Sequence, residues 1–217
     1  MKKFWTVLPL CAAMLCTSAF AAAFPDLPEE HWAYSAVDKM HSDGRVNGFP
    51  DGEFKPDELV TRWQFAKMAG GDPDAMRYPD RPATRDEAAE YLWERAGKPA
   101  EVAPAAVTRT SDNPDAVAWA YARGVMKGDD GFNLRLDSTL TRAEAAKLLC
   151  EAFSLTEGEE EGKTFSDVDA AAWYAEYIRC AAQNGVILGD ENNRFYPEET
   201  VKREEFAAMV MGGAALL

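Results

Sequence analysis

Histidine and cysteine are scarce in this sequence, and neither occurs in a catalytic or metal-binding pattern. The two histidines, His31 and His41, have a spacing that does not bring them to one face of a helix. No group of Cys, His and acidic residues has the spacing of a zinc or calcium site, and no phosphate-binding loop or nucleophile motif is present. We therefore expect no metal, no cofactor and no enzymatic activity.

Positive charge is also in short supply. The chain has 23 Lys and Arg against 37 Asp and Glu, which gives a formal net charge of −14. Binding to nucleic acid needs a basic surface, so we expect no nucleic acid partner and no docking on anionic lipid. After the first residues no apolar stretch is long enough to cross a bilayer, and we expect no membrane span in the mature chain.

The first residues have the layout of a secretory signal peptide. Lys2 and Lys3 precede an apolar stretch over 4–15, and small residues follow up to Ala21 and Ala23. The sequence therefore predicts that residues 1–23 are removed on export and that the mature protein is secreted. An uncleaved membrane anchor is the alternative, although the apolar stretch is short for a bilayer span.

Two cysteines remain after the predicted signal peptide, Cys150 and Cys180, and they lie on two different predicted helices. The extracellular environment permits a disulfide between them. One pair does not make a disulfide scaffold in a chain of this size, so a disulfide and two buried thiols both stay open.

An internal repeat is the strongest signal in the chain. The sequence from Phe24 onward aligns without a gap with the sequence from Phe165 onward, and aromatic, acidic, glycine and arginine positions coincide. The matched pairs include Asp26 with Asp167, Trp32 with Trp173, Gly48 with Gly189, and Arg62 with Arg203. Two repeats therefore frame the mature chain.

A third, degraded copy and an extra half copy lie between these two repeats. Gly128 and Arg142 match Gly48 and Arg62, but Asp112 stands where a tryptophan is expected. The half copy repeats only the stretch around Thr84 and Arg85. The predicted order is repeat 1 over 24–71, an inserted half repeat over 72–98, a linker over 99–110, repeat 2 over 111–155, an acidic linker over 156–164, and repeat 3 over 165–217.

Each full unit has the pattern of two helices joined by a turn. A glycine ends the first helix, at Gly44, Gly124 and Gly185, because only glycine adopts the left-handed C-cap without cost. The second helix begins at a capping box, Thr61…Gln64, Thr84…Glu87 and Thr141…Glu144, whereas repeat 3 has Lys202 in place of the threonine. One such helix pair cannot bury its own apolar face, so we expect an all-α protein whose units share a core.

An arginine recurs in the first turn of every second helix, at Arg62, Arg85, Arg142 and Arg203. The helix dipole disfavours a cation there by roughly 0.3–1 kcal/mol, which indicates another use for the side chain. Two interpretations stay open. The arginines pair with carboxylates such as Asp26 or Asp167, or they form anion-binding sites together with the helix-start amides.

These stretches resemble one known family. The segments F-P-D-L…W-A-Y-S-A-V…V-T-R, L-T-R-A-E-A-A-K-L-L and F-S-D-V…W-Y…V-K-R-E-E-F-A-A-M-V are similar to S-layer homology (SLH) repeats. The resemblance implies helix–loop–helix repeats arranged as a pseudo-threefold spindle around a shared helical bundle. It also implies a protein of the cell wall or S-layer that binds secondary cell-wall polysaccharide, commonly pyruvylated, in grooves between the repeats.

Matching this sequence to the family's motif residue by residue gives the candidate glycan-binding residues. They are Arg62, Arg142, Arg203, Asp26, Asp167, Trp32, Trp173, Gly48, Gly128, Gly189, Glu144 and Glu205. Because repeat 1 has Trp63-Gln64 in place of Ala-Glu, we favour grooves near Arg142 and Arg203 over one near Arg62. For the two tryptophans, packing in the core is an equal alternative.

Two other functions stay open beside polysaccharide attachment. The degraded second repeat is compatible with an SLH-fold scaffold that binds other surface proteins and has lost its glycan site. The third possibility is a surface protein that binds peptidoglycan.

Overall fold

The computed structural model describes residues 22–75, 78–128, 132–156 and 164–214. The predicted signal peptide falls almost wholly outside the described residues. Within them the regular elements are helices, and the only β pairing consists of isolated bridges. The predicted all-α class is therefore confirmed. No helix in the described part of the chain has the length and apolarity that a membrane span requires.

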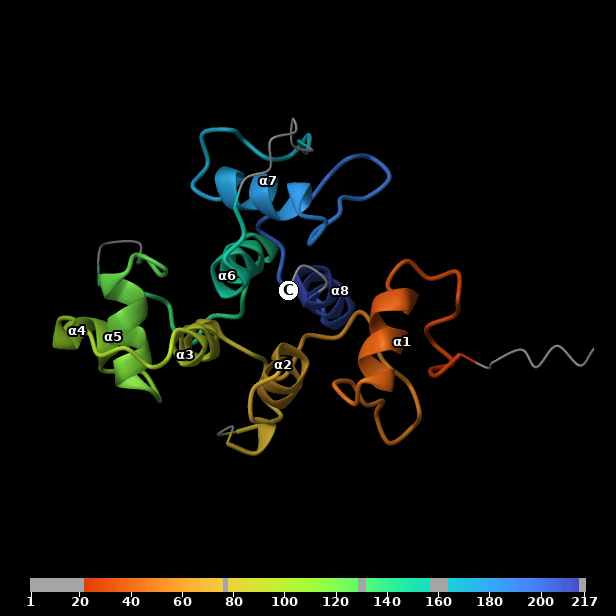
Figure 1. Ribbon diagram of the computed structural model, residues 1–217, viewed down its shortest axis with the longest axis horizontal. Coiled ribbons are helices and arrows are strands. Elements are labelled where there is room, and N and C mark those ends of the chain that lie inside the picture. The colour runs from red at the N-terminus through yellow and green to blue at the C-terminus, as the bar shows by residue number, and fades with distance from the viewer. Residues whose placement is uncertain (1–21, 76–77, 129–131, 157–163, 215–217) are drawn as a thin grey trace, which may run out of the picture.

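Four inner helices form a closed ring at the centre (Figure 1). The helices α2 (Arg62–Ala69), α3 (Arg85–Arg95), α6 (Arg142–Phe153) and α8 (Arg203–Ala214) each contact the next, and α8 contacts α2. Four isolated bridges tie the starts of these helices together, Leu59 to Lys202, Thr61 to Pro82, Thr84 to Thr139, and Thr141 to Thr200. A threefold spindle would have three inner helices. The fourth is α3, which lies in the segment predicted to be an inserted half repeat.

Three outer helices surround this ring. The helices α1 (Tyr34–Ser42), α5 (Pro114–Ala122) and α7 (Ala175–Gln183) pack on α8, α3 and α6 respectively. Each outer helix thus packs on the inner helix of the preceding unit, and the first unit packs on the last. Two short helices complete the fold, η1 (Pro73–Ala75) against α2 and α4 (Ala105–Thr108) against α5.

The predicted helix ends are present. Gly44, Gly124 and Gly185 have φ angles near 70°, in the left-handed region that glycine adopts freely. At α2 and α6 the threonine hydroxyl accepts from the N3 amide, and the N3 side chain accepts from the threonine amide. At α3 Glu87 accepts from both the amide and the hydroxyl of Thr84. At α8 only half of the box is left, since Glu205 accepts from the amide of Lys202.

One continuous apolar core joins the units. Between α2 and α8 the rings of Phe65 and Phe206 stack with centroids 4.8 Å apart, and Phe65 also meets Tyr91 of α3 edge-on. Cys150 of α6 and Cys180 of α7 belong to the same core as two buried free thiols. Burial raises the pKa of the Cys150 thiol, and the neighbouring Cys180 adds to that effect.

Candidate functional site

The recurring arginines are buried at the starts of the four inner helices and reach across the ring. In three of the four junctions the guanidinium pairs with the N3 glutamate of the next inner helix, Arg62 with Glu87 at 3.0 Å, Arg85 with Glu144, and Arg142 with Glu205. The interpretation as ion pairs is therefore confirmed for these three. The carboxylates are those of the capping boxes and not those of Asp26 and Asp167.

The fourth junction, between α8 and α2, lacks this ion pair. Each N3 glutamate gives one oxygen to its own cap amide and the other to the arginine of the preceding unit. Gln64 uses its only oxygen to accept from the amide of Thr61, and its NH2 group is a donor that cannot pair with a guanidinium. Arg203 instead donates to the carbonyl oxygens of Phe54 and Asn47. Burial lowers the pKa of Arg203 to about 10.

The two predicted aspartates hold loops within their own repeats. The carboxylate of Asp26 accepts from the amides of Phe54 and Lys55 at 2.8 and 2.7 Å. Asp167 accepts in the same way from the amides of Phe195 and Tyr196, at the same distances. Their carboxylates are engaged by backbone amides, so the structure gives both residues a structural role.

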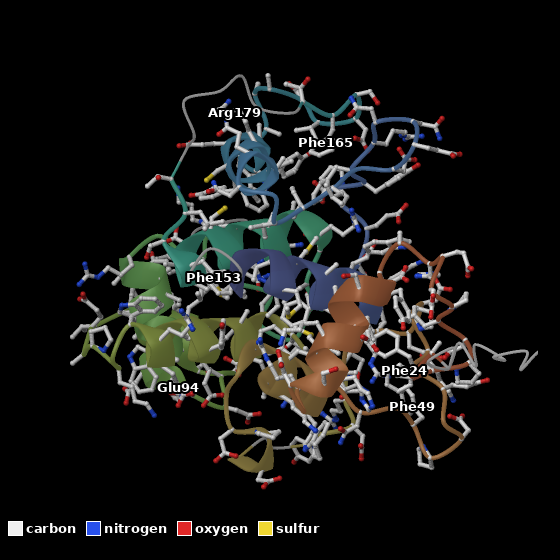
Figure 2. All side chains as sticks on the ribbon, turned by 45° about the vertical axis from the view of Figure 1, so that its right-hand side comes forward. Phe24, Phe49, Glu94, Phe153, Phe165 and Arg179 are labelled. Atoms are coloured by element: carbon white, nitrogen blue, oxygen red, sulfur yellow. The ribbon has the colours of Figure 1, made fainter. Side chains whose placement is uncertain are left out.

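The predicted glycines are required by close packing of the same loops. A Cβ atom on Gly48 would lie 2.7 Å from the ring of Phe24, and one on Gly189 would lie 2.5 Å from the ring of Phe165. Figure 2 labels both phenylalanines, on the loops beside α1 and α7. For Gly128 the close contact is with the backbone, since its Cβ would lie 2.4 Å from the carbonyl oxygen of Asn133.

The tryptophans lie at the surface. Trp32 is 56 % exposed and Trp173 is 55 % exposed, so core packing does not account for either. In the second repeat Asp112 occupies the corresponding position, and its carboxylate lies 3.3 Å from Nη1 of Arg62. The α2–α3 junction thus has a second acid where two other units present an indole.

A cavity of about 350 Å³ opens at the α3–α6 junction. Arg85, Lys127, Arg135 and Lys147 bring four positive charges to its wall, and Glu144 brings one negative charge. Gly128, Trp173 and Tyr177 also line it. We call this cavity the α3–α6 groove.

Some of the charged groups of this groove are buried. Lys147 is only 8 % exposed, and burial lowers its pKa. Its Nζ donates to the carbonyl oxygen of Gly124 at 3.0 Å and lies 5.0 Å from the centre of the Tyr177 ring. Glu144 pairs with Arg85 and also faces Arg135 at 3.5 Å. The groove therefore keeps an excess of positive charge in a chain that is acidic as a whole.

The groove unites only part of the set predicted from the sequence. Gly128, Glu144 and Trp173 line it, whereas the remaining predicted residues lie elsewhere on the ring or in its loops. Lys127, Arg135, Lys147 and Tyr177 were missing from the prediction, and Arg85 was recognised only as a recurring arginine. A signal was available, since Arg135 and Lys147 occupy the positions that Lys55 and Lys67 hold in repeat 1.

Comparison with known proteins finds one family at three places in the chain. The family model described as the S-layer homology domain matches residues 23–66, 107–146 and 164–207. An amylopullulanase of Thermoanaerobacterium thermosulfurigenes is 28 % identical over 85 % of this chain and 9 % of its own length. S-layer protein EA1 of Bacillus anthracis is 25 % identical over 89 % of this chain and 20 % of its own length. Outer membrane protein alpha of Thermotoga maritima is 49 % identical over 26 % of this chain and 15 % of its own length. The chain thus spans a small part of each of these relatives.

Proposed function

Because the chain belongs to the S-layer homology family and lies at the cell surface, we propose that it attaches there by binding an acidic cell-wall polysaccharide in the α3–α6 groove. The observation that carries this proposal is the wall of the groove, with four cations against one carboxylate. A pyruvylated sugar has the chemistry that fits, since its ketal carboxylate is fixed on an otherwise uncharged ring. The relatives named as enzymes share with this chain only a small part of their length, and the role that we propose is binding without catalysis.

The partly buried cations are suited to a carboxylate. A charge-assisted hydrogen bond gains strength where water is excluded, and Lys147 lies in such a place. Lys127 and Arg135 are exposed at the mouth of the groove and would meet the ligand first. Arg85 acts indirectly, because Glu144 and backbone carbonyl oxygens already occupy its guanidinium. We therefore assign Arg85 to positioning.

The exposed indole supplies an apolar surface beside these charges. Trp173 and Tyr177 come from the third unit and close the groove formed by the half repeat and the second unit. Aromatic rings offer flat contact area at a low cost in conformational entropy, which suits the face of a sugar ring. The binding site therefore depends on three consecutive units.

The other junctions are weaker candidates. At the α6–α8 junction the positions of Lys127, Arg135 and Lys147 are held by Leu188, Tyr196 and Ala208, so the surrounding cations are missing. Arg142, Glu205 and Trp32 stand there without them, and we propose weaker binding at that junction. At the α8–α2 junction Lys55 and Lys67 hold the positions of Arg135 and Lys147. The half repeat, however, repeats only the second-helix stretch and so supplies no counterpart of Trp173.

A matched pair of double variants tests the proposed site. Lys127→Ala with Trp173→Ala removes two exposed residues of the α3–α6 groove, and Leu188→Ala with Trp32→Ala removes their counterparts at the α6–α8 junction. In cosedimentation with purified cell wall, we expect the first variant to lose affinity at least about tenfold, which is about 1.4 kcal/mol. The second should lose no more than about twofold. Equal affinity of both variants and the wild type contradicts the proposal.

The ligand is tested by comparing wall preparations. We expect retention on wall that carries its acidic polysaccharide and loss of retention when the polysaccharide is removed or its pyruvyl group is absent. Retention on bare peptidoglycan would favour the peptidoglycan-binding alternative. Retention on neither, with binding to other surface proteins, would favour the scaffold. The internal ion pairs of Arg62, Arg85 and Arg142 support this last alternative, since a guanidinium that pairs inside the ring is less available to a ligand.

A further inference from the structure

A second cavity of about 380 Å³ lies beside the α3–α6 groove. One wall is α4 with the residues that follow it, including Arg109 and Thr110. The other wall is the loop of repeat 2 over 132–138, including Phe132 and Asn133. Arg135 lines both cavities, so the two are neighbours that share one side chain.

From this arrangement we propose that the second cavity is an extension subsite, which holds the sugar units next to the acidic sugar bound in the α3–α6 groove. The inference rests on the proposed function of that groove. It adds that this protein recognises a stretch of polymer and not one sugar alone.

The chemistry of the second cavity fits a chain of sugars. Phe132 is 52 % exposed and presents an aromatic face, while Asn133, Thr110 and Ser138 offer groups that can exchange hydrogen bonds with sugar hydroxyls. Two arginines and one aspartate, Asp137, give the lining a small positive excess. Such a mixture of polar groups around one aromatic ring suits an extended carbohydrate better than a compact anion.

Arg135 is held in place between the two cavities. Its backbone has φ near 50°, in the left-handed region, and its amide donates to Oδ1 of Asn133 at 3.2 Å. Its guanidinium lies 3.5 Å from Glu144 on the groove side, and about half of the side chain is exposed. A ligand that continues from one cavity into the other passes over this side chain.

The wall formed by α4 belongs to the segment over 99–110, which the sequence predicts to be a linker. The structure shows that part of this segment is a helix, anchored through the buried side chain of Val107 and packed on α5. Neither of the other full repeats is preceded by this segment, so the extension subsite is a feature of repeat 2. Arg109 on this wall has no carboxylate partner among the residues that the structure describes.

The length of the ligand separates this inference from the proposed function. The probes are one repeating unit and an oligomer of at least three repeating units, both prepared from the acidic wall polysaccharide and titrated against the full chain by calorimetry. The wild type should bind the oligomer about tenfold more tightly than the single unit. We expect Arg109→Ala with Phe132→Ala to remove this advantage and to leave the affinity for the single unit unchanged.

Two controls make each outcome decisive. Val102→Ala removes another exposed apolar side chain of the same segment and should change neither affinity, while circular dichroism checks that the variants stay folded. Lys127→Ala with Trp173→Ala should lower the affinity for both probes. If the Arg109 and Phe132 variant binds the oligomer like the wild type, the extension subsite is wrong and the groove stands. If the Lys127 and Trp173 variant binds both probes like the wild type, the proposed function itself fails.

Discussion

Two neighbouring junctions of the ring use the same arginine and the same glutamate position for different ends. At the α2–α3 junction Arg62 meets Glu87 and then a second carboxylate, Asp112. At the α3–α6 junction Arg85 meets Glu144, while additional cations and the exposed Trp173 surround the pair. The ion pair is common to both and belongs to the architecture. The capacity to bind an anion comes from the residues around it, which are not part of the recurring motif.

The largest effects are expected when the arginine of either junction, Arg62 or Arg85, is replaced by alanine. Arg62→Ala leaves the buried Glu87 without its guanidinium partner, whereas Arg85→Ala leaves Glu144 only its longer contact with Arg135. In urea titrations we expect the free energy of unfolding to fall by about 3–5 kcal/mol for Arg62→Ala and by less for Arg85→Ala. Only Arg85→Ala should also weaken wall binding, by displacing Glu144 and the groove around it. Glu87→Gln placed on Arg62→Ala should recover part of the stability. A loss below about 1 kcal/mol in both variants would show that the pairs are not buried in solution.

The residue that follows the recurring arginine should make the stability of the protein depend on pH. Ala143 of α6 corresponds to Glu204 of α8, whose side chain is 10 % exposed and lies 3.4 Å from His31. Burial raises the pKa of Glu204 to about 7, with the nearby carboxylates of Asp57 and Glu205 adding to the effect. The folded state therefore holds this proton more tightly than the unfolded state. The stability from Glu204 is complete below about pH 4.5 and is lost as the pH rises through about 7.

Glu204→Gln should remove this pH dependence. Between pH 4.5 and pH 8 we expect the variant to gain about 2 kcal/mol relative to the wild type, measured as the free energy of unfolding at several pH values. The same measurement on a His31→Gln background separates the titration of the carboxyl from that of the imidazole. Parallel curves for the wild type and the variant would refute the assignment.

The smallest effect is expected at the junction without an ion pair. Gln64→Glu places a carboxylate at the N3 position of α2, and it restores the residue type that the other three junctions have there. We expect the thermal midpoint to rise by a few degrees, equivalent to about 1 kcal/mol, because the new carboxylate can pair with the buried guanidinium of Arg203. Gln64→Met is the matched control, since methionine has a volume similar to that of glutamate and carries no charge. A variant with Glu no more stable than the one with Met would contradict the expected pairing.

The sequence was a good guide wherever local chemistry decides the structure. The glycine C-caps, the three capping boxes and the weakened start of α8 at Lys202 follow from residue type and spacing alone, and all are present. The sequence predicted ion pairs for the recurring arginines but named the wrong carboxylates. The glutamate partner of each paired arginine lies on the next unit of the ring, and the sequence of one repeat does not show which unit is next. The groove was foreseen least. Arg135 has a left-handed backbone conformation, and Trp173 comes from another unit. Spacing within one repeat predicts neither the direction of the first side chain nor the position of the second.

The packing of α1 on α8 joins the earliest part of the folded chain to the latest. Val37 and Met40 are the buried residues of α1, whereas α8 begins only at Arg203. Contacts of such wide sequence separation form slowly, because a long loop must close before they add stability. We therefore expect the first unit to complete its packing only after α8 has formed, and we expect removal of α8 to expose the apolar face of α1.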